Sequence, residues 1–136
     1  MANTARQNPS VAIIGAGMTG ILVAIKLREA GITDITILEK ADRLGGTWRE
    51  NTYPGVACDV PAHMYTYSFR GNPEWEHRFA RGPEIQRYFQ QVADENGVTG
   101  QIRFNEAVEA SHWRDGKWHV TTSKGNQLVV DFVIAA

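Results

Sequence analysis

The chain alternates between short apolar runs and amphipathic stretches. Residues 11–14 and 35–38 are almost wholly apolar, which is typical of parallel strands covered on both faces. Between them, residues 17–30 place apolar side chains at helical spacing, and Gly31 follows where a helix commonly ends. This order predicts a β-strand, an α-helix and a second, parallel β-strand joined by a right-handed crossover.

The middle of the chain has a different character. Residues 40–72 lack a clear period and are punctuated by glycine and proline, which predicts a long loop. A loop of that length inside a compact domain is usually functional. Pro83 begins a second predicted helix that ends at Asn96 and Gly97, and residues 102–104 predict a short strand.

The last part of the chain is patterned as an antiparallel sheet. Residues 108–113 and 118–122 predict two strands, and Asp115-Gly116 predicts the hairpin turn between them. Residues 128–136 are expected to return as one or two strands, ending in a buried one. The expected fold is therefore α/β: a Rossmann-like βαβ unit with a parallel sheet, plus an antiparallel β-meander.

Composition narrows the class of protein. The 136 residues suit one domain, and a net charge of −1 gives no basic surface for nucleic acid or an anionic membrane. No apolar stretch is long enough to cross a membrane. The single cysteine, Cys58, cannot form an internal disulfide, which fits a cytoplasmic protein.

A glycine-rich turn follows the first predicted strand. Gly15 allows the tight turn, Gly17 lets backbone approach a pyrophosphate, and Gly20 lets the helix pack closely on the sheet. Glu39 ends the second strand, where a carboxylate can bind ribose hydroxyls. The pattern predicts a site for the adenosine half of a dinucleotide. The alternatives are an ordinary strand-to-helix turn and a solvated Glu39 beside Lys40.

A second glycine pair comes soon after Glu39. In the run Gly45-Gly46-Thr47-Trp48, the glycines let backbone amides reach further phosphate oxygens and the indole can cover a flat ring. The alternative is a turn with a core tryptophan.

Residues 53–65 mix rigid turns with polar and aromatic side chains. Asp59 lies between apolar neighbours and is expected to be partly buried with a partner, or else to cap a turn. Tyr65 and Tyr67 fit a site or the core equally well, and Cys58 is expected to be a packed thiol. His63 and His77 have no second ligand at metal spacing, so no metal site is expected. His112 and His119 fall on the predicted meander strands and are expected to be surface or satisfied side chains.

Together these motifs resemble a known family. Gly-Ala-Gly-Met-Thr-Gly at residues 15–20, Glu39-Lys40, Gly-Gly-Thr-Trp at residues 45–48 and Tyr-Pro-Gly-Val-Ala-Cys-Asp-Val-Pro at residues 53–61 are similar to the N-terminal FAD-binding segment of class B flavoprotein monooxygenases. Baeyer–Villiger monooxygenases are the nearest match and flavin-containing monooxygenases are relatives. The resemblance extends from Ser10 to Ala136.

The resemblance implies a role for each matching residue. FAD would lie extended over the carboxyl ends of the parallel strands. The implied contacts are Gly15, Gly17, Met18, Thr19 and Gly20 with the pyrophosphate region, Glu39 and Lys40 with the adenosine ribose, Gly46, Thr47 and Trp48 with the middle of the cofactor, Asp59 and Tyr65 near the flavin ring, and the Val108 backbone with the adenine.

The resemblance also implies a reaction. NADPH reduces FAD, oxygen adds to the reduced flavin, and the product attacks a ketone or a soft heteroatom. Asp59 is the one catalytic residue that can be transferred to this sequence, because its counterpart lies close to the nicotinamide.

The match also sets expectations about domain organisation. Residues 1–9 are expected to be a flexible tail, and residues 10–136 an FAD-binding domain that is incomplete relative to the family and stops before the NADPH domain. Such a portion is expected to be inactive alone, to hold FAD weakly and to self-associate through an exposed face. The alternatives are a nicotinamide-binding dehydrogenase module and a non-catalytic protein that holds flavin or docks a partner.

Overall fold

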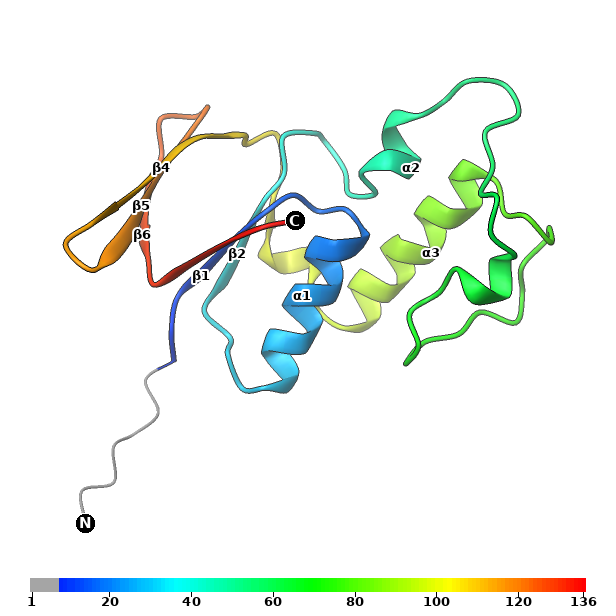
Figure 1. The fold of residues 1–136 in the computed structure, drawn as a ribbon, viewed down its shortest axis with the longest axis horizontal. Helices are drawn as coiled ribbons and strands as arrows, with labels where there is room; N and C mark the ends of the chain where they lie inside the picture. Colours follow the sequence, from blue (N-terminus) through cyan, green and yellow to red (C-terminus); the bar gives the residue numbers. More distant parts are fainter. Residues whose placement is uncertain (1–7) are drawn as a thin grey trace, which may run out of the picture.

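A parallel sheet forms the centre of the molecule. The computed structural model describes residues 8–136 (Figure 1). The sheet has the strand order β3-β2-β1-β7, and every neighbouring pair is parallel. Its strands are β1 (Val11–Ile14), β2 (Ile35–Leu38), β3 (Ile102–Arg103) and β7 (Phe132–Ala135). The predicted strands at residues 11–14 and 35–38 are confirmed with the same bounds.

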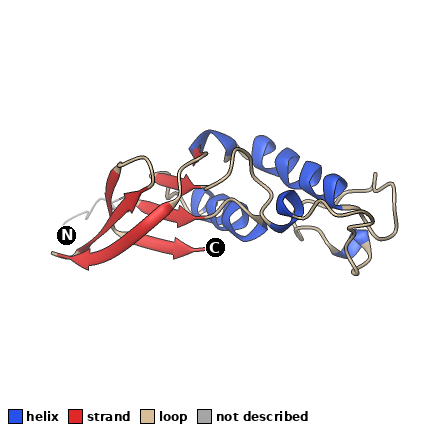
Figure 2. Cartoon of the chain, turned by 90° about the horizontal axis from the view of Figure 1, so that it is seen from above, coloured by secondary structure: helices blue, strands red, loops and turns tan. Residues whose placement is uncertain are grey.

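Apolar side chains cover both faces of β1, which explains why its sequence does not alternate. Val11 and Ile13 belong to the main core with helix α1 (Met18–Glu29) and helix α3 (Gly82–Glu95). Ala12 belongs to a smaller core on the other face, with Val120 and Val130. In the second view the strands gather at one end of the molecule and the helices at the other (Figure 2).

The smaller core is completed by a three-stranded antiparallel sheet, ordered β4-β5-β6. Its strands are β4 (Val108–Arg114), β5 (Lys117–Thr122) and β6 (Gln127–Val130). Asp115 and Gly116 turn the first hairpin with φ of 52° and 76°, the left-handed conformation that a two-residue hairpin loop favours. The predicted meander and its Asp-Gly turn are thus confirmed.

The long segment before α3 is folded against that helix. It contains the short helix α2 (Thr47–Glu50) and the 3-10 turn η1 (Ala62–Met64); a second 3-10 turn, η2 (Thr99–Gln101), precedes β3. Backbone hydrogen bonds from Cys58 to Ala80 and from Ala62 to Arg78 double the segment back on itself. Tyr88 and Phe89 of α3 are buried, and their rings pack against Tyr67 of this segment.

The final strand was expected to be buried, but β7 is an edge strand whose Phe132 is 56% exposed, because the described residues supply a neighbour on the β1 side alone. Of the expected tail, residues 1–7 lie outside the described part of the chain, whereas Asn8 exchanges two hydrogen bonds with Thr33. Within residues 8–136 no helix has the length and apolar character needed to cross a membrane.

Candidate functional site

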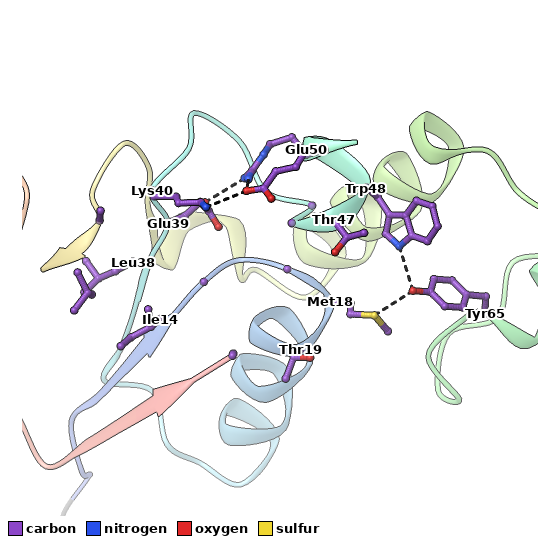
Figure 3. A pocket seen from close by; sticks show the side chains of 18 residues that line it. Ile14, Met18, Thr19, Leu38, Glu39, Lys40, Thr47, Trp48, Glu50 and Tyr65 are labelled. Atoms are coloured by element: carbon purple, nitrogen blue, oxygen red, sulfur yellow. Dashed lines mark hydrogen bonds and ion pairs between the residues drawn. The ribbon is translucent and has the colours of Figure 1, made fainter. Parts of the chain in front are cut away.

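A cavity of about 480 Å³ opens at the carboxyl ends of β1, β2 and β7 (Figure 3). This edge of a parallel sheet is where open α/β folds bind ligands. Ile14, Leu38 and Ala136 mark the strand ends, and the remaining walls come from α1, α2, the loops that follow β1, β2 and η1, and the start of β4. Of the residues predicted to contact the cofactor, those in the wall are Gly15, Gly17, Met18, Thr19, Glu39, Lys40, Gly46, Thr47, Trp48, Tyr65 and Val108.

The first glycine turn places the start of α1 at the cavity. Gly17 occupies the N-cap position, and no side chain caps the helix, so its first N–H groups are left to the cavity. Gly20 lies beneath the wall instead of in it. A Cβ atom at Gly20 would stand 2.0 Å from the Gly15 carbonyl oxygen, which explains why the helix can pack this closely only with glycine there.

The second glycine turn packs directly against the first in the wall of the cavity. Gly45 donates its N–H to the Ala16 carbonyl over 3.0 Å. Gly46 has φ of 50°, and a Cβ atom there would lie 3.2 Å from the Gly17 Cα. Two backbone segments therefore approach the same part of the cavity without side chains between them.

Charged side chains of the cavity wall form a cluster that we call the ionic end: Glu39, Lys40, Arg49 and Glu50. Figure 3 shows Glu39, Lys40 and Glu50 together at one side of the cavity. The Glu39 carboxylate is buried and accepts hydrogen bonds from the Ala16 and Ala41 N–H groups over 2.8 and 2.9 Å. It also accepts one from Arg49 Nη1 over 3.1 Å. The alternative of a solvated Glu39 is therefore wrong.

The ion pairs continue outward from Glu39. Arg49 Nη2 lies 2.7 Å from Glu50 Oε1, and Lys40 Nζ lies 3.2 Å from the same oxygen. Hydrogen bonding and attraction to Lys40, followed by attraction to Arg49, lower the pKa of the Glu50 carboxyl. The four charges alternate in sign, so the ionic end carries no net charge.

The opposite side, which we call the aromatic end, consists of Met18, Trp48 and Tyr65. The Trp48 indole N–H donates to the Tyr65 hydroxyl over 3.1 Å, and the two rings meet edge to face at 5.7 Å. The Tyr65 hydroxyl donates to Met18 Sδ over 3.5 Å (Figure 3). This end offers aromatic and thioether surface with few polar groups, which suits a flat ring.

A buried carboxylate supports the wall formed by Ala107 and Val108. Glu106 accepts hydrogen bonds from Thr122 Oγ1 over 2.8 Å and from Asn126 Nδ2 over 2.7 Å. The bond from Asn126, and then that from Thr122, lower the pKa of the Glu106 carboxyl. The Glu106 N–H donates to the Glu39 carbonyl, which joins this wall to the end of β2.

Besides Gly20, Asp59 is a predicted residue that does not line the cavity. It was expected to be partly buried with a partner, yet it is exposed and is not among the lining residues. Its apolar neighbours account for the error, because Cys58 is buried while Asp59 turns to solvent. Cys58 is confirmed as a packed thiol, and Tyr67 lies in the core, where burial raises the pKa of its phenol.

Sequence reasoning assigned no role to several residues that the site uses. They are Arg49, Glu50 and Ala107, which line the cavity. A charged pair such as Arg49-Glu50 is indistinguishable from a solvated surface in sequence alone, whereas Gly45 was expected to approach a ligand as part of the glycine pair and does line the cavity. No cluster of potential metal ligands occurs in residues 8–136.

Known proteins are similar to this chain in sequence. The family model for NAD(P)-binding Rossmann-like domains matches residues 13–92. An uncharacterised monooxygenase of Mycobacterium tuberculosis is 52% identical over 94% of this chain and 26% of its own length. A Baeyer–Villiger monooxygenase of Streptomyces coelicolor is 44% identical over 93% of the chain and 24% of its own length.

A solved structure is similar to this chain in fold and in sequence. The crystal structure of OTEMO in complex with FAD and NADP superposes with a TM-score of 0.85 at 35% identity, covering 94% of this chain and 25% of that one. The chain thus spans about a quarter of the length of the proteins it matches. The chain belongs to the NAD(P)-binding Rossmann-like domain family, and the relatives that it resembles there are Baeyer–Villiger and FAD-binding monooxygenases.

Proposed function

We propose that this chain holds the FAD of an NADPH-using Baeyer–Villiger-type monooxygenase. The observation that supports this most directly is the pair of glycine turns that meet in the cavity wall, at Gly17 and Gly46. An extended dinucleotide has a charged pyrophosphate at its middle, and two adjacent backbone segments without side chains let it approach this wall closely.

The residues present fit FAD along its length. The uncapped start of α1 suits the pyrophosphate, Glu39 and Lys40 suit the adenosine ribose, and the aromatic end suits the flavin ring. Bound FAD would supply the redox chemistry, while these groups bind and orient it. The substrates proposed for the whole enzyme are a ketone or a heteroatom-containing small molecule, and the proposed location is the cytoplasm.

Asp59 keeps its proposed catalytic role near the nicotinamide, although it lies outside the cavity wall. An exposed carboxylate can serve a second ligand that arrives from solvent, as NADPH would. The proposed partner surface for self-association is the exposed edge of β7, including Phe132. Light scattering of the purified chain tests that surface.

The rival function is a nicotinamide-binding dehydrogenase module. Such a module explains the first glycine turn and Glu39, but it gives no reason for the second turn or for the Trp48–Tyr65 pair at the cavity. Calorimetric titration of the purified chain with FAD and with NAD⁺ distinguishes these two functions. Tighter binding of FAD is expected; binding of NAD⁺ with no binding of FAD would contradict the proposal.

The activity of the chain alone is a separate question. We expect the 136 residues to bind FAD without consuming NADPH. Apart from the two glycine turns assigned to FAD, these residues contain no glycine-rich motif for binding NADPH. Steady NADPH oxidation with conversion of a ketone to an ester by the isolated chain would contradict this expectation.

A further inference from the structure

We propose that Arg49 is a positioning residue that fixes Glu39 and, through Glu39, the first glycine turn. This inference rests on the proposed function, because it concerns the ribose end of the FAD site. Arg49 is a buried arginine, with only 7% of its side chain exposed. Its Nη1 donates to Glu39 Oε1 and to the Arg43 carbonyl, over 3.1 and 2.8 Å, while Nη2 donates to Glu50.

Glu39 needs such a partner. Its carboxylate has 5% of its side chain exposed, and a buried carboxylate is strongly unfavourable unless it is paired and hydrogen-bonded. The N–H groups of Ala16 and Ala41 alone would leave its negative charge uncompensated. Arg49 supplies the opposite charge from the side away from the first turn.

The contacts form a continuous path between the two glycine turns. Arg49 lies in α2, which begins directly after Gly46. Glu39 joins it to the Ala16 N–H, which belongs to the first turn. The Arg49–Glu39 pair therefore sets the separation of the two turns on the ionic side of the cavity, in addition to the Gly45–Ala16 backbone bond.

The hydrogen-bond pattern also leaves Glu39 available to a ligand. A carboxylate has about four acceptor positions, and the protein uses three, from Ala16, Ala41 and Arg49. Glu39 still lines the cavity. With its rotamer fixed by Arg49, the remaining acceptor position can point at a ribose hydroxyl without further ordering.

Lysine cannot replace Arg49 in this arrangement. The two guanidinium nitrogens reach the Glu39 carboxylate, the Arg43 carbonyl and the Glu50 carboxylate at once, which requires a planar fork of donors. The single ammonium of a lysine can satisfy the charge but not this geometry. Arg49→Lys is accordingly the informative variant, and Arg43→Lys is its matched control. The Arg43 side chain is 60% exposed, and its ion pair with Asp42 is long, at 3.9 Å.

The first measurement uses the ligand-free protein. Hydrogen exchange of the Ala16 and Ala41 amides, followed by NMR, should accelerate by about tenfold in Arg49→Lys. The amide of Ile21, which bonds to Gly17 within the helix, should keep its rate in the variant, as should all three amides in Arg43→Lys. Unchanged exchange at Ala16 in Arg49→Lys would overturn the proposal. If that variant does not fold, Arg49→Gln is measured in its place under the same criterion.

The second measurement concerns the ligand. We expect the wild-type chain to prefer ADP over 2′,3′-dideoxy-ADP by at least about tenfold, because a hydrogen bond from a hydroxyl to a charged carboxylate is stronger than one between neutral groups. Arg49→Lys should reduce that preference to within about twofold while Arg43→Lys retains it. Retention of the full preference in Arg49→Lys would overturn the positioning role. Failure of the wild-type chain to bind FAD at all would instead contradict the proposed function, and the exchange measurement would still decide the role of Arg49.

Discussion

The two ends of the cavity are built in opposite ways. At the ionic end, Glu39 and Arg49 are buried and paired with each other before any ligand arrives. At the aromatic end, Trp48, Tyr65 and Met18 touch through one indole hydrogen bond and one weak contact to sulfur, and Met18 is 40% exposed. The difference indicates a rigid end that sets specificity by fixed hydrogen bonds and a softer end that adapts to a flat ring.

The largest effect should come from the turn on which both ends depend. Gly20→Ala places a Cβ atom 2.0 Å from the Gly15 carbonyl oxygen, so α1 must move away from the sheet. We expect a loss of at least about 3 kcal/mol in the free energy of unfolding, measured by urea denaturation. Gly100→Ala is the control, since its added Cβ atom meets nothing within 4 Å. Equal stability of the two variants would show that the turn tolerates this shift.

The next effect should fall on the ionic end alone. Glu39→Ala leaves the buried Arg49 without its carboxylate, and breaking a buried pair from one side costs about 3–5 kcal/mol. The matched control is Glu29→Ala, which breaks the Lys26–Glu29 pair, whose side chains are about half exposed; that change should cost less than about 1 kcal/mol. If both variants unfold at the same urea concentration, the ionic end is not the rigid one.

A smaller effect is expected at the aromatic end. Tyr65→Phe removes the hydroxyl that accepts from Trp48 and donates to Met18. The free energy of unfolding should fall by about 1 kcal/mol, the usual worth of one partly exposed hydrogen bond. Tyr53→Phe, at a tyrosine that is 60% exposed, serves as the control. A loss from Tyr65→Phe as large as that from Glu39→Ala would reverse the comparison.

The smallest effect concerns pH. The pKa of Glu50 is lowered by Lys40 and Arg49, so the favourable contacts of its carboxylate are present above the ordinary value of 4.5 and are lost as the pH falls below it. Tm should therefore decline more steeply with acidification below about pH 4.5 in the wild-type chain than in Glu50→Gln. Parallel Tm profiles from pH 6 to pH 3 would show that the outer ion pairs contribute nothing.

Sequence predicted the parts of the fold that depend on local pattern. Unbroken apolar character located β1 and β2, and the Asp115-Gly116 pair located a hairpin because its positive φ angles favour such residues. The exposure of β7 could not be predicted, since it depends on which strands pair with it and not on its own apolar side chains.

The site divides in the same way. Gly17 and Glu39 could be predicted to lie together because a strand, a turn and a helix fix their positions. Arg49 could not be assigned to Glu39, because α2 lies within a segment without periodicity and its position depends on packing against α3. Asp59 was misjudged because apolar neighbours in a loop do not fix the direction of the side chain between them.

The most direct test of the central claim is FAD binding by Gly17→Ala. A Cβ atom at Gly17 would lie 3.8 Å from the Gly46 Cα, an ordinary contact, so the chain should remain folded with a stability within about 1 kcal/mol of wild type. The methyl group would nevertheless cover part of the bare backbone wall formed by the two glycine turns, against which the pyrophosphate is proposed to lie. The account predicts at least about tenfold weaker binding of FAD by calorimetry; unchanged affinity in a folded Gly17→Ala protein would contradict it.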